Sequence, residues 1–529
     1  MKHFNKDIKI LLEYWQDSFR GFHPVMFDED VYDSCSDDIS SLPPFYLGLV
    51  KHCFGDYYEL TPAGQALLTS KRKEEVLLRQ MLKFQVPSPY HKPTAKAASF
   101  WVKPYLEILR LVRTMGTLRF DELQIFGMQL TDWRNFESIV RKIETFRIAK
   151  IGHQGSYNAF KAEYLRNELT RIFEERIMNG ETQTRESNDA SLDKFLRTQS
   201  GNMRDYADAC FRYLRATGLV NVSHVGKSLS IVPERTEDVD YILQTIDRNP
   251  CFIENERDYI EYLGNAEIPQ LLTDDRQRLV AKLHTEFPQV GFDQETETSV
   301  LKELLADLTE QRKTDTLSRQ VVEIKDYKLY DDIQNTFRQI EKKELYDAPL
   351  MLEWNTWRAM TMLDGGEIKA NLNFDDFGKP LSTAQGNMAD IVCDYGDFGL
   401  SVEVTMASGQ KQYEMEGEPV ARHLGKLKRT IEKPAYCLFI APTINEACIA
   451  YFFMLHKTNL TFYGGKSTII PLPLNIFQKM LEDSRKASYV PQPKQVKRLF
   501  EYSNEVAELC DNENIWYEQI MAKAMNWLE

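Results

Sequence analysis

Two acidic residues, Asp390 and Glu403, lie in a segment whose pattern predicts a β-hairpin. The dipeptide Gly396-Asp397 separates two apolar runs, and glycine supplies the positive φ that a two-residue turn needs. With this dipeptide as the loop, Asp390 falls directly opposite Glu403. Opposed side chains on paired strands have Cβ atoms about 5 Å apart, and two like charges repel at that distance. A divalent cation between the carboxylates would offset the repulsion, because hard cations prefer oxygen ligands.

Side chains alternate along a strand, so the two faces of this hairpin can be sorted from the sequence. The apolar face, which predicts core, comprises Ala389, Ile391, Cys393, Leu400, Val402 and Val404. The other face carries Asp390, Asp394, Ser401, Glu403 and Thr405, with Val392 as its apolar member. Two interpretations stay open: a metal-binding face, or a surface hairpin whose acids face water.

The segments around the hairpin predict an α/β domain. Helices are expected at 352–363 (containing Glu353), 444–456 and 474–481, and strands at 435–441 and 467–472. Residues 409–432 carry Glu414, Glu416 and Glu418 before Pro419, which either begins a second helix or kinks a single long one. This order of elements predicts a mixed sheet flanked by helices.

An Asp on one strand, a Glu on the next and a helix behind them is the layout of the PD-(D/E)xK nuclease fold. In that fold the Asp and Glu hold Mg²⁺, with Mn²⁺ as the expected substitute, against the scissile phosphate. The ion polarises the phosphoryl group and lowers the pKa of a bound water. The residue after the Glu, here Val404, commonly adds its backbone carbonyl as a metal ligand.

Two positions depart from the usual pattern of that fold. Ala389 stands where a proline usually precedes the Asp, and Thr405 stands where a lysine usually follows the Glu. The cation that orients the attacking water is therefore missing from its usual place. Gln410, Lys411 or His423 can substitute for it, and the sequence does not choose among the three.

Longer motifs make the chain similar to a narrower group, the AlwI/BstNBI group of type IIS restriction and nicking endonucleases, through most of its length. The motifs that carry the resemblance are 353–357 (EWNTW), 385–390 (QGNMAD), 403–405 (EVT), 415–423 (MEGEPVARH), 437–442 (CLFIAP), 82–88 (LKFQVPS) and the helix from Arg204 to Gly218. The resemblance implies an N-terminal recognition half, a helical linker and a C-terminal cleavage domain. It also implies an active site of Glu353, Asp390, Glu403, Glu416 and His423.

The five implied residues differ in how far the sequence supports them independently. Asp390 and Glu403 are predicted by the hairpin geometry as well. Glu416 and His423 are seven residues apart, which is one helical face if no kink intervenes. Glu416 would bind metal indirectly, and His423 would assist the water or contact phosphate. For His423, the competing interpretation is a structural histidine beside Glu418. For Glu353, it is a residue on a solvated helix face.

Composition narrows the class of protein. The 529 residues are too many for one core, so two to four domains are expected. Hydrophobic content of 43% and charged content of 27% are ordinary for a globular protein. No apolar run approaches the roughly 20 residues of a membrane span, so no membrane partner is expected. The eight scattered cysteines form no C-x-x-C pair, and the N-terminus lacks signal-peptide features, which predicts a cytoplasmic protein with reduced thiols.

The net charge of −14 is unevenly distributed along the chain. Residues 71–230 carry 27 Lys and Arg against 18 Asp and Glu, a net of +9, whereas the segments before and after are acidic. A basic middle in an acidic chain is typical of a phosphate-binding surface, which predicts double-stranded DNA as the partner. The competing interpretation is a chance fluctuation in charge density.

The basic segment also predicts DNA-binding modules. Thr61 and Pro62 predict a helix start after a short strand at 57–60, as is common in winged-helix modules. Helices ending at Gly116 and Gly218, and a β-wing turning at Gly226-Lys227, predict helix-turn-helix or winged-helix-like units. A loop with His91, Lys92 and Lys96 would suit backbone contact, unless it is only an interdomain crossing. The residues predicted to lie nearest DNA are Lys83, Arg204, Arg212, Arg215 and Lys227.

The sequence therefore predicts a multidomain protein with an α-rich, winged-helix-like recognition half. The predicted parts are recognition subdomains at 1–95 and 96–297, a helical linker at 298–345 and a PD-(D/E)xK cleavage domain at 346–529. The predicted function is a Mg²⁺-dependent type IIS endonuclease that binds a short asymmetric site and cuts a fixed distance away. One active site cuts one strand, so the chain would dimerise transiently, recruit a smaller nuclease subunit, or only nick. The alternative is a non-catalytic winged-helix DNA-binding or regulatory protein with a degenerate nuclease domain.

Overall fold

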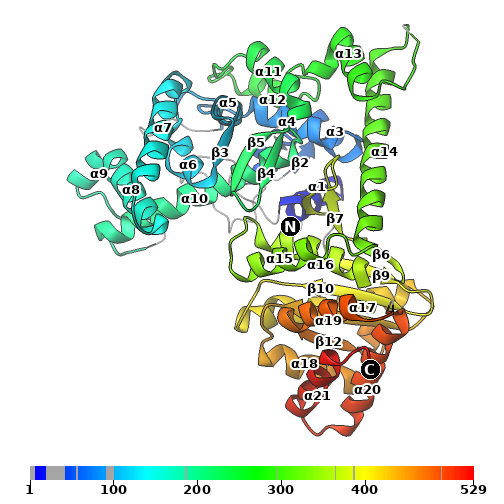
Figure 1. The fold of residues 1–529 in the computed structure, drawn as a ribbon. Helices are drawn as coiled ribbons and strands as arrows, with labels where there is room; N and C mark the ends of the chain where they lie inside the picture. Colours follow the sequence, from blue (N-terminus) through cyan, green and yellow to red (C-terminus); the bar gives the residue numbers. More distant parts are fainter. Residues whose placement is uncertain are drawn as a thin grey trace. The chain divides into compact units, whose positions relative to one another are not determined.

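The computed structural model divides the chain into two compact units, Met1–Leu308 and Thr309–Glu529, and each is described by itself (Figure 1). The residues that the structure describes are 6–19, 42–54, 57–90, 100–184, 187–293, 295–363, 365–384, 388–489 and 491–529. None of the helices in these ranges is long and apolar enough to cross a membrane. The predicted loop residues His91, Lys92 and Lys96, and residues 385–387 of the resemblance motif, lie outside the described residues.

The described part of the first unit begins with four helices and a two-stranded sheet that is exposed over much of its length. These elements are α1 Lys6–Phe19, α2 Pro43–Tyr46, β1 Val50–Phe54, β2 Tyr57–Leu60, α3 Pro62–Thr69 and α4 Lys73–Lys83. The predicted helix start is confirmed, because the Thr61 side chain accepts a hydrogen bond from the Gly64 amide at 3.1 Å and Pro62 occupies the first turn.

A second group of helices in this unit is built on a three-stranded antiparallel sheet of order β3-β5-β4. Its elements are α5 Pro104–Met115, β3 Thr117–Arg119, α6 Phe120–Ile125, α7 Phe136–Gly152, α8 Tyr157–Ile172, α9 Glu174–Met178, α10 Leu192–Ala216, β4 Val220–Ser223 and β5 Ser228–Ile231. Gly116 ends α5 with a φ of +70°, a conformation that glycine adopts without strain. The turn predicted at Gly226-Lys227 joins β4 and β5, which pair antiparallel.

The remainder of the first unit is helical. Its helices are α11 Thr236–Thr245, α12 Glu256–Gly264 and α13 Arg276–Glu286, followed by α14 Thr298–Lys325. Leu279, Leu283 and Phe287 of the α13 region pack with Leu301 and Leu305 of α14 in a small core of their own. The boundary between the two units falls inside α14, so one continuous helix belongs to both.

The second unit is an α/β domain around a five-stranded mixed sheet of order β12-β11-β10-β9-β6. Its strands are β6 Glu367–Ala370, β9 Ile391–Asp394, β10 Gly399–Val404, β11 Ala435–Ala441 and β12 Ile469–Pro473, with β7 Leu372–Phe374 and β8 Pro380–Thr383 as a separate hairpin. Its helices are α15 Tyr330–Glu341, α16 Ala348–Leu363, α17 Gln410–Thr430, α18 Glu446–Lys457, α19 Leu474–Lys486, α20 Pro493–Leu509 and α21 Glu513–Met525.

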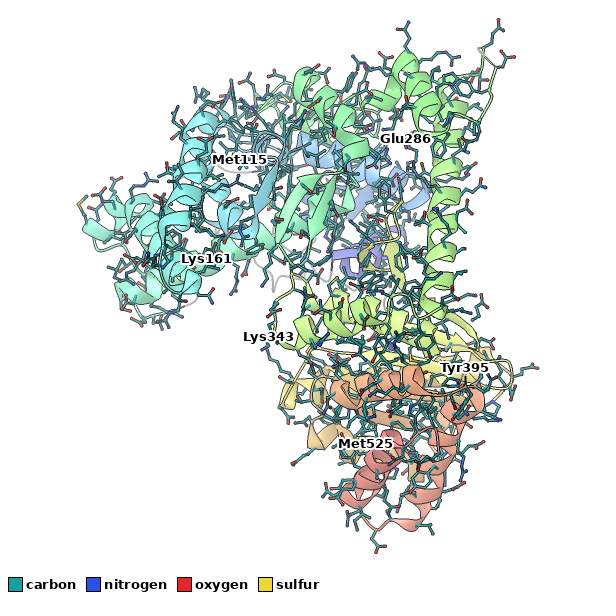
Figure 2. All side chains as sticks on the ribbon, viewed as in Figure 1. Met115, Lys161, Glu286, Lys343, Tyr395 and Met525 are labelled. Carbon is teal, nitrogen blue, oxygen red and sulfur yellow. The ribbon has the colours of Figure 1, made fainter. Side chains whose placement is uncertain are left out.

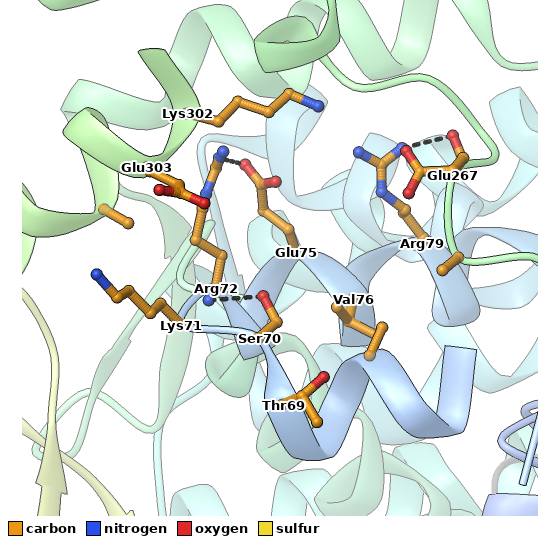
Figure 3. A pocket seen from close by; sticks show the side chains of 13 residues that line it. Thr69, Ser70, Lys71, Arg72, Glu75, Val76, Arg79, Glu267, Lys302 and Glu303 are labelled. Carbon is orange, nitrogen blue, oxygen red and sulfur yellow. Dashed lines mark hydrogen bonds and ion pairs between the residues drawn. The ribbon is translucent and has the colours of Figure 1, made fainter. Parts of the chain in front are cut away.

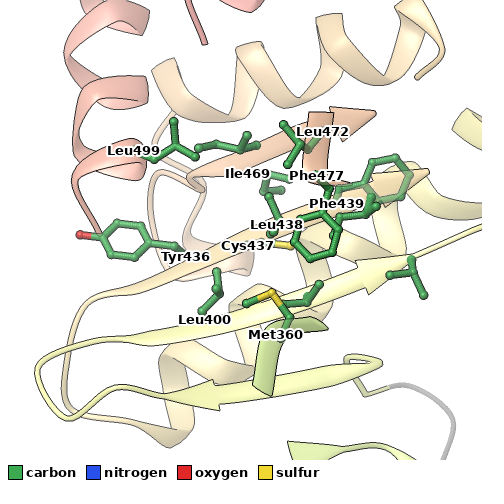
Figure 4. Close-up of a cluster of buried hydrophobic side chains, with 14 of the residues drawn as sticks. Met360, Leu400, Tyr436, Cys437, Leu438, Phe439, Ile469, Leu472, Phe477 and Leu499 are labelled. Atoms are coloured by element: carbon green, nitrogen blue, oxygen red, sulfur yellow. The ribbon is translucent and has the colours of Figure 1, made fainter. Parts of the chain in front are cut away.

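The central strands pair in both directions. β10 runs parallel to β11 and antiparallel to β9, and β11 runs parallel to β12. The strand β11 is buried along its whole length, as expected for a strand covered on both faces. Figure 4 shows part of the core formed on these strands, where Leu400, Cys437 and Leu438 lie near Met360.

Pairing in the β9–β10 hairpin follows the predicted register. Asp394 pairs with Gly399 and Ile391 pairs with Val402, which leaves Gly396-Asp397 as the loop. Tyr395, the residue just before this loop, is labelled in Figure 2. Gly396 has a φ of +84°, as the turn requires. The interpretation as a surface hairpin is wrong, because every residue of β10 is buried, Glu403 included.

Several predicted elements differ from those observed. Residues 410–430 form one helix with Pro419 inside it, which excludes a second helix beginning at the proline. β6, the β7–β8 hairpin, α20 and α21 were not predicted. Short strands without strong alternation carry little periodic signal, and β6 is held by its pairing with β9 rather than by its own pattern.

Candidate active site

Asp390 and Glu403 lie side by side near the middle of the sheet in the second unit. Asp390 directly precedes β9, and the register places it opposite Glu403 on β10. The Asp390 carboxylate accepts a hydrogen bond from the Val404 amide at 2.8 Å. The Asn371 amide donates to the Asp390 carbonyl, also at 2.8 Å. The backbone therefore fixes Asp390 from two sides.

Helix α17 brings two further predicted residues to this face of the sheet. It packs on β10 and β11, and its His423 Nδ1 lies 2.9 Å from Glu403 Oε1. Burial raises the pKa of Glu416, two turns earlier, and its hydrogen bond to the Thr405 side chain opposes that shift. Because Pro419 does not end the helix, Glu416 and His423 share one helical face, as the seven-residue spacing required.

Glu353 reaches the site from α16, where its side chain is only 9% exposed. Thr383, at the end of β8, donates a hydrogen bond to Glu353 Oε2 at 3.2 Å. Burial excludes the interpretation of Glu353 as a solvated helix face. Sequence reasoning missed Thr383, and no motif or spacing pointed to it, since β8 was itself not predicted.

The carboxylates of the site perturb one another. Burial raises the pKa of Asp390 well above the ordinary carboxyl range, and the charges of Glu353 and Glu403 raise it further. Burial also raises the pKa of Glu403, with Glu416 as the next contribution. Backbone N–H groups oppose both shifts by stabilising the ionised forms. Concentrated buried negative charge of this kind is typical of a site that binds a cation.

His423 is held in its neutral form. Burial lowers the pKa of His423 to about 4, and the neighbouring charges of Arg422 and Lys426 lower it further. Beside an ionised Glu403, the neutral imidazole would carry its proton on Nδ1, the nitrogen that faces this carboxylate. Nε2 then keeps a lone pair, and it has no hydrogen-bond partner among the residues that the structure describes. This nitrogen can accept a proton.

The donor set fits a hard divalent cation. Within the described residues, no three His, Cys, Asp or Glu side chains come together in a way that could hold a metal ion. Mg²⁺ needs fewer protein ligands, because it commonly keeps several waters and is held by one or two carboxylates together with substrate phosphate. Asp390 and Glu403, with the Val404 carbonyl, supply oxygen donors of that kind.

Of the three candidates to replace the motif lysine, His423 has a hydrogen bond to a carboxylate of the site. Gln410 and Lys411 are exposed residues in the first turn of α17. Thr405 itself, in the lysine position, is 8% exposed, and its hydroxyl accepts from the Ala407 amide while it holds Glu416.

The predicted DNA-binding residues of the first unit are not all at its surface. Lys83 is fully buried, and its ammonium donates to the carbonyls of Leu263 and Asn265 at 2.8 and 2.5 Å, at the C-terminal end of α12. Burial lowers the pKa of Lys83 to about 6. The prediction that Lys83 contacts DNA is therefore wrong, because its side chain has no exposed surface.

The remaining four predicted DNA-binding residues differ in exposure. Arg215 is 6% exposed, so its prediction as a DNA contact is also wrong. Arg212 is half-buried and pairs with Asp208 at 2.7 Å. Arg204 is 64% exposed beside Asp205, and Lys227 lies half-buried in the β4–β5 turn. The side chains of Arg204 and Lys227 have the solvent-exposed surface that a contact with DNA phosphate needs.

A pocket of about 440 Å³ in the first unit does not provide an anion site. It lies between α4 and the start of α14 (Figure 3). Its cations are satisfied by protein groups: Arg72 pairs with Glu75, Arg79 pairs with Asp274 at 2.9 Å, and Lys302 also pairs with Asp274. The pocket is lined by a structural network of ion pairs.

Comparison with known proteins gives a family match over most of the chain. A family model described as AlwI restriction endonuclease matches residues 45–480, which include all five candidate active-site residues. No curated protein matches the chain. Among solved structures, the small subunit (R.BspD6I2) of the heterodimeric restriction endonuclease R.BspD6I is similar, with 24% sequence identity over 37% of this chain and 95% of that chain and a TM-score of 0.30.

Proposed function

The chain belongs to the AlwI restriction endonuclease family, and we propose that it is a Mg²⁺-dependent type IIS enzyme that cuts DNA a fixed distance from a short asymmetric site. Membership in the family makes it a restriction endonuclease, a site-specific nuclease that acts on DNA. The metal, the type IIS mode of cutting and the catalytic roles of single residues are parts of the proposal.

The observation that supports the proposal most is that four carboxyl groups, those of Asp390, Glu403, Glu353 and Glu416, lie close enough for their charges to raise the pKa of Asp390 and Glu403, while the neutral His423 ring contacts Glu403. Asp390 and Glu403, with the Val404 carbonyl, would hold the ion against the scissile phosphate. When bound there, Mg²⁺ would polarise the phosphoryl group and lower the pKa of a coordinated water. The cation would also offset the repulsion that raises the pKa of both carboxyls.

His423 would act as the proton acceptor. With Glu403 ionised, its Nδ1–H would donate to Glu403 and orient the ring, and its Nε2 lone pair would take the proton of the attacking water. Glu416, held by Thr405, would bind the ion through water. Glu353, which lies on α16 and accepts a hydrogen bond from Thr383, would add a further negative charge to the metal site.

Recognition is assigned to residues 1–297, as subdomains 1–95 and 96–297, with 298–345 as the linker and 346–529 as the cleavage domain. The order α5, β3, α6, α10, β4, β5, together with the sheet order β3-β5-β4, supports a winged-helix module into which α7 to α9 are inserted. In such a module α10 would be the recognition helix and β4–β5 the wing, so Arg204 and Lys227 would face DNA.

Digestion of supercoiled plasmid by the purified chain with Mg²⁺ tests the proposal, with products read on native and strand-specific denaturing gels. Discrete linear fragments would mean double-strand cutting through transient dimerisation. Open circles cut at fixed positions in one strand would mean a nicking enzyme, or the large subunit of a pair with a smaller nuclease subunit. An absence of cutting with Mg²⁺ or Mn²⁺ on DNA that the chain binds would refute the proposal in favour of a non-catalytic DNA-binding protein.

A further inference from the structure

The β7–β8 hairpin connects the linker helix to the candidate active site within the second unit. Its tip, residues 375–379, touches α14: Arg312 pairs with Asp376 at 3.0 Å, and the Gln320 side-chain amide donates to the Phe377 carbonyl at 3.2 Å. The Arg312 guanidinium also lies 5.8 Å from the centre of the Phe377 ring. The tip is therefore fixed to the helix by charge, hydrogen bond and packing.

The tip is stiff and closely fitted to α14. One oxygen of the Asp375 carboxylate accepts from the amides of Phe377 and Lys379 at 2.9 and 2.8 Å, which closes the turn. Gly378 has a φ of +73°, and a Cβ at this position would lie 2.7 Å from the Gln320 side chain. The positive φ favours glycine here, and a larger residue would also displace the end of the Gln320 side chain.

The base of the same hairpin is joined to two residues of the site, to the side chain of Glu353 and to the backbone of Asp390. Thr383 donates to Glu353 Oε2 at 3.2 Å, and the Asn371 amide donates to the Asp390 carbonyl at 2.8 Å. The Ala384 amide in turn donates to the Asn371 carbonyl at 2.8 Å, so both attachment points belong to one hydrogen-bonded unit. β8 also packs on α16, the helix that carries Glu353.

From these contacts we propose that the β7–β8 hairpin is a positioning element for cleavage, in which Thr383 orients Glu353 and the Arg312–Asp376 pair holds the hairpin against α14. This inference rests on the proposed function, because it assigns a task in the same metal site. Groups that orient the residues of a metal site change metal affinity or activity by about 10- to 100-fold when they are removed. The cleavage site would thus depend on how α14 engages the hairpin.

Matched variants of Thr383 test the first part of the inference. Thr383→Val keeps the shape and removes the hydroxyl, whereas Thr383→Ser keeps the hydroxyl. We expect Thr383→Val to weaken Ca²⁺ binding by the full chain, measured by calorimetry without DNA, and to raise the Mg²⁺ concentration for half-maximal cleavage, each by about tenfold. Thr383→Ser should stay near wild type, and both variants should keep wild-type affinity for site-containing DNA. Equal values for the two variants in both metal measurements would overturn the inference.

A double-mutant cycle tests the second part of the inference, that the Arg312–Asp376 pair holds the hairpin against α14. Arg312→Ala and Asp376→Ala should each lower the cleavage rate about three- to tenfold at saturating DNA, with the double variant no slower than the slower single variant. Lys313→Ala is the control, since Lys313 pairs with Glu310 of its own helix. If the two single substitutions lower the cleavage rate additively, or if the control lowers it equally, the proposed role of the Arg312–Asp376 pair is wrong.

The two proposals fail in different ways. A wild-type chain that binds Ca²⁺ but cuts no DNA would refute the proposed function, while the calorimetric comparison of Thr383→Val with Thr383→Ser would still decide the role of the hairpin. A wild-type chain that neither binds divalent cations nor cuts would overturn both.

Discussion

The Asp390 carboxylate accepts a hydrogen bond from the Val404 amide at 2.8 Å, which ties the start of β9 to the end of β10. This bond uses one oxygen of the carboxylate and leaves the second oxygen available as a metal ligand. Burial and the neighbouring acidic residues raise the pKa of the Asp390 carboxyl. The residue thus has a structural and a proposed catalytic task that substitution can separate.

Asp390→Asn should abolish cleavage while leaving the fold and site binding intact. The amide can still accept from Val404, but it has lost the charge that would hold Mg²⁺, so we expect the cleavage rate to fall roughly a thousandfold, equivalent to about 4 kcal/mol. Plasmid cleavage and gel-shift binding measure the two effects. Asp394→Asn, at the exposed end of the same strand beside Lys433, should cleave normally. Comparable losses in both variants would contradict the assigned role.

Glu403→Gln should stabilise the metal-free protein. A carboxyl whose pKa is raised by folding binds more protons in the folded state, so it destabilises the fold increasingly as pH rises above the unfolded value. Removing the charge should raise the free energy of unfolding by about 1–2 kcal/mol at pH 7. Thermal unfolding with and without Mg²⁺ measures this. The ion should stabilise the wild type and leave the variant unchanged; a wild type that does not respond to Mg²⁺ would contradict the prediction.

Two variants of His423 separate its proposed tasks. His423→Asn keeps a donor for Glu403 and loses the basic nitrogen, whereas His423→Ala loses both. Both should cut about 100-fold more slowly, the lower range for a lost general base. Only His423→Ala should also weaken Ca²⁺ binding in calorimetry, because it leaves Glu403 without its partner. Near-normal cleavage by His423→Asn would exclude proton transfer through this ring.

His456 should make the stability of the second unit dependent on pH. Its Nε2 accepts the Ile469 amide at 3.0 Å, which requires the neutral ring, and burial lowers the pKa of His456 to about 4. Because the pKa is lowered by folding, the unfolded chain binds a proton at His456 between pH 6.5 and 4 and the folded chain does not. The contribution of His456 to the free energy of unfolding is therefore fully present above pH 6.5 and is lost as the pH falls toward 4. The full effect is about 3 kcal/mol.

Denaturant unfolding of the wild type and of His456→Gln at pH 7, 5.5 and 4 measures this dependence. The variant should be less stable at pH 7, because the ring packs against Trp516, and its stability should change less with pH. His423 titrates in the same range in both proteins, so the difference between the two curves isolates His456. Parallel curves would contradict the assignment.

Arg204→Ala should weaken DNA binding and lower its salt dependence. One lost phosphate contact reduces the slope of log affinity against log salt by about 1 and weakens binding similarly for all sequences. Fluorescence anisotropy across a salt series measures both quantities. Arg498→Ala, which removes an equally charged and half-exposed side chain from α20, is the control. An unchanged slope for Arg204→Ala would remove α10 from the DNA-binding surface.

The sequence by itself determined the elements that follow local rules. The β9–β10 register, the opposition of Asp390 and Glu403 and the capping of α3 by Thr61 follow from turn chemistry, strand alternation and cap preference, each of which acts within a few residues. Strand β11 was predicted at its observed bounds because its apolar run is continuous.

Only the tertiary structure decided which side chains meet and which remain at the surface. Lys83 and Arg215 looked like DNA contacts by charge, but packing against distant segments buries them. Thr383 reaches Glu353, and His423 reaches Glu403, through contacts between residues 30 and 20 positions apart. Such contacts form because the sheet and its covering helices bury apolar surface together, and no pattern within either segment specifies the partner.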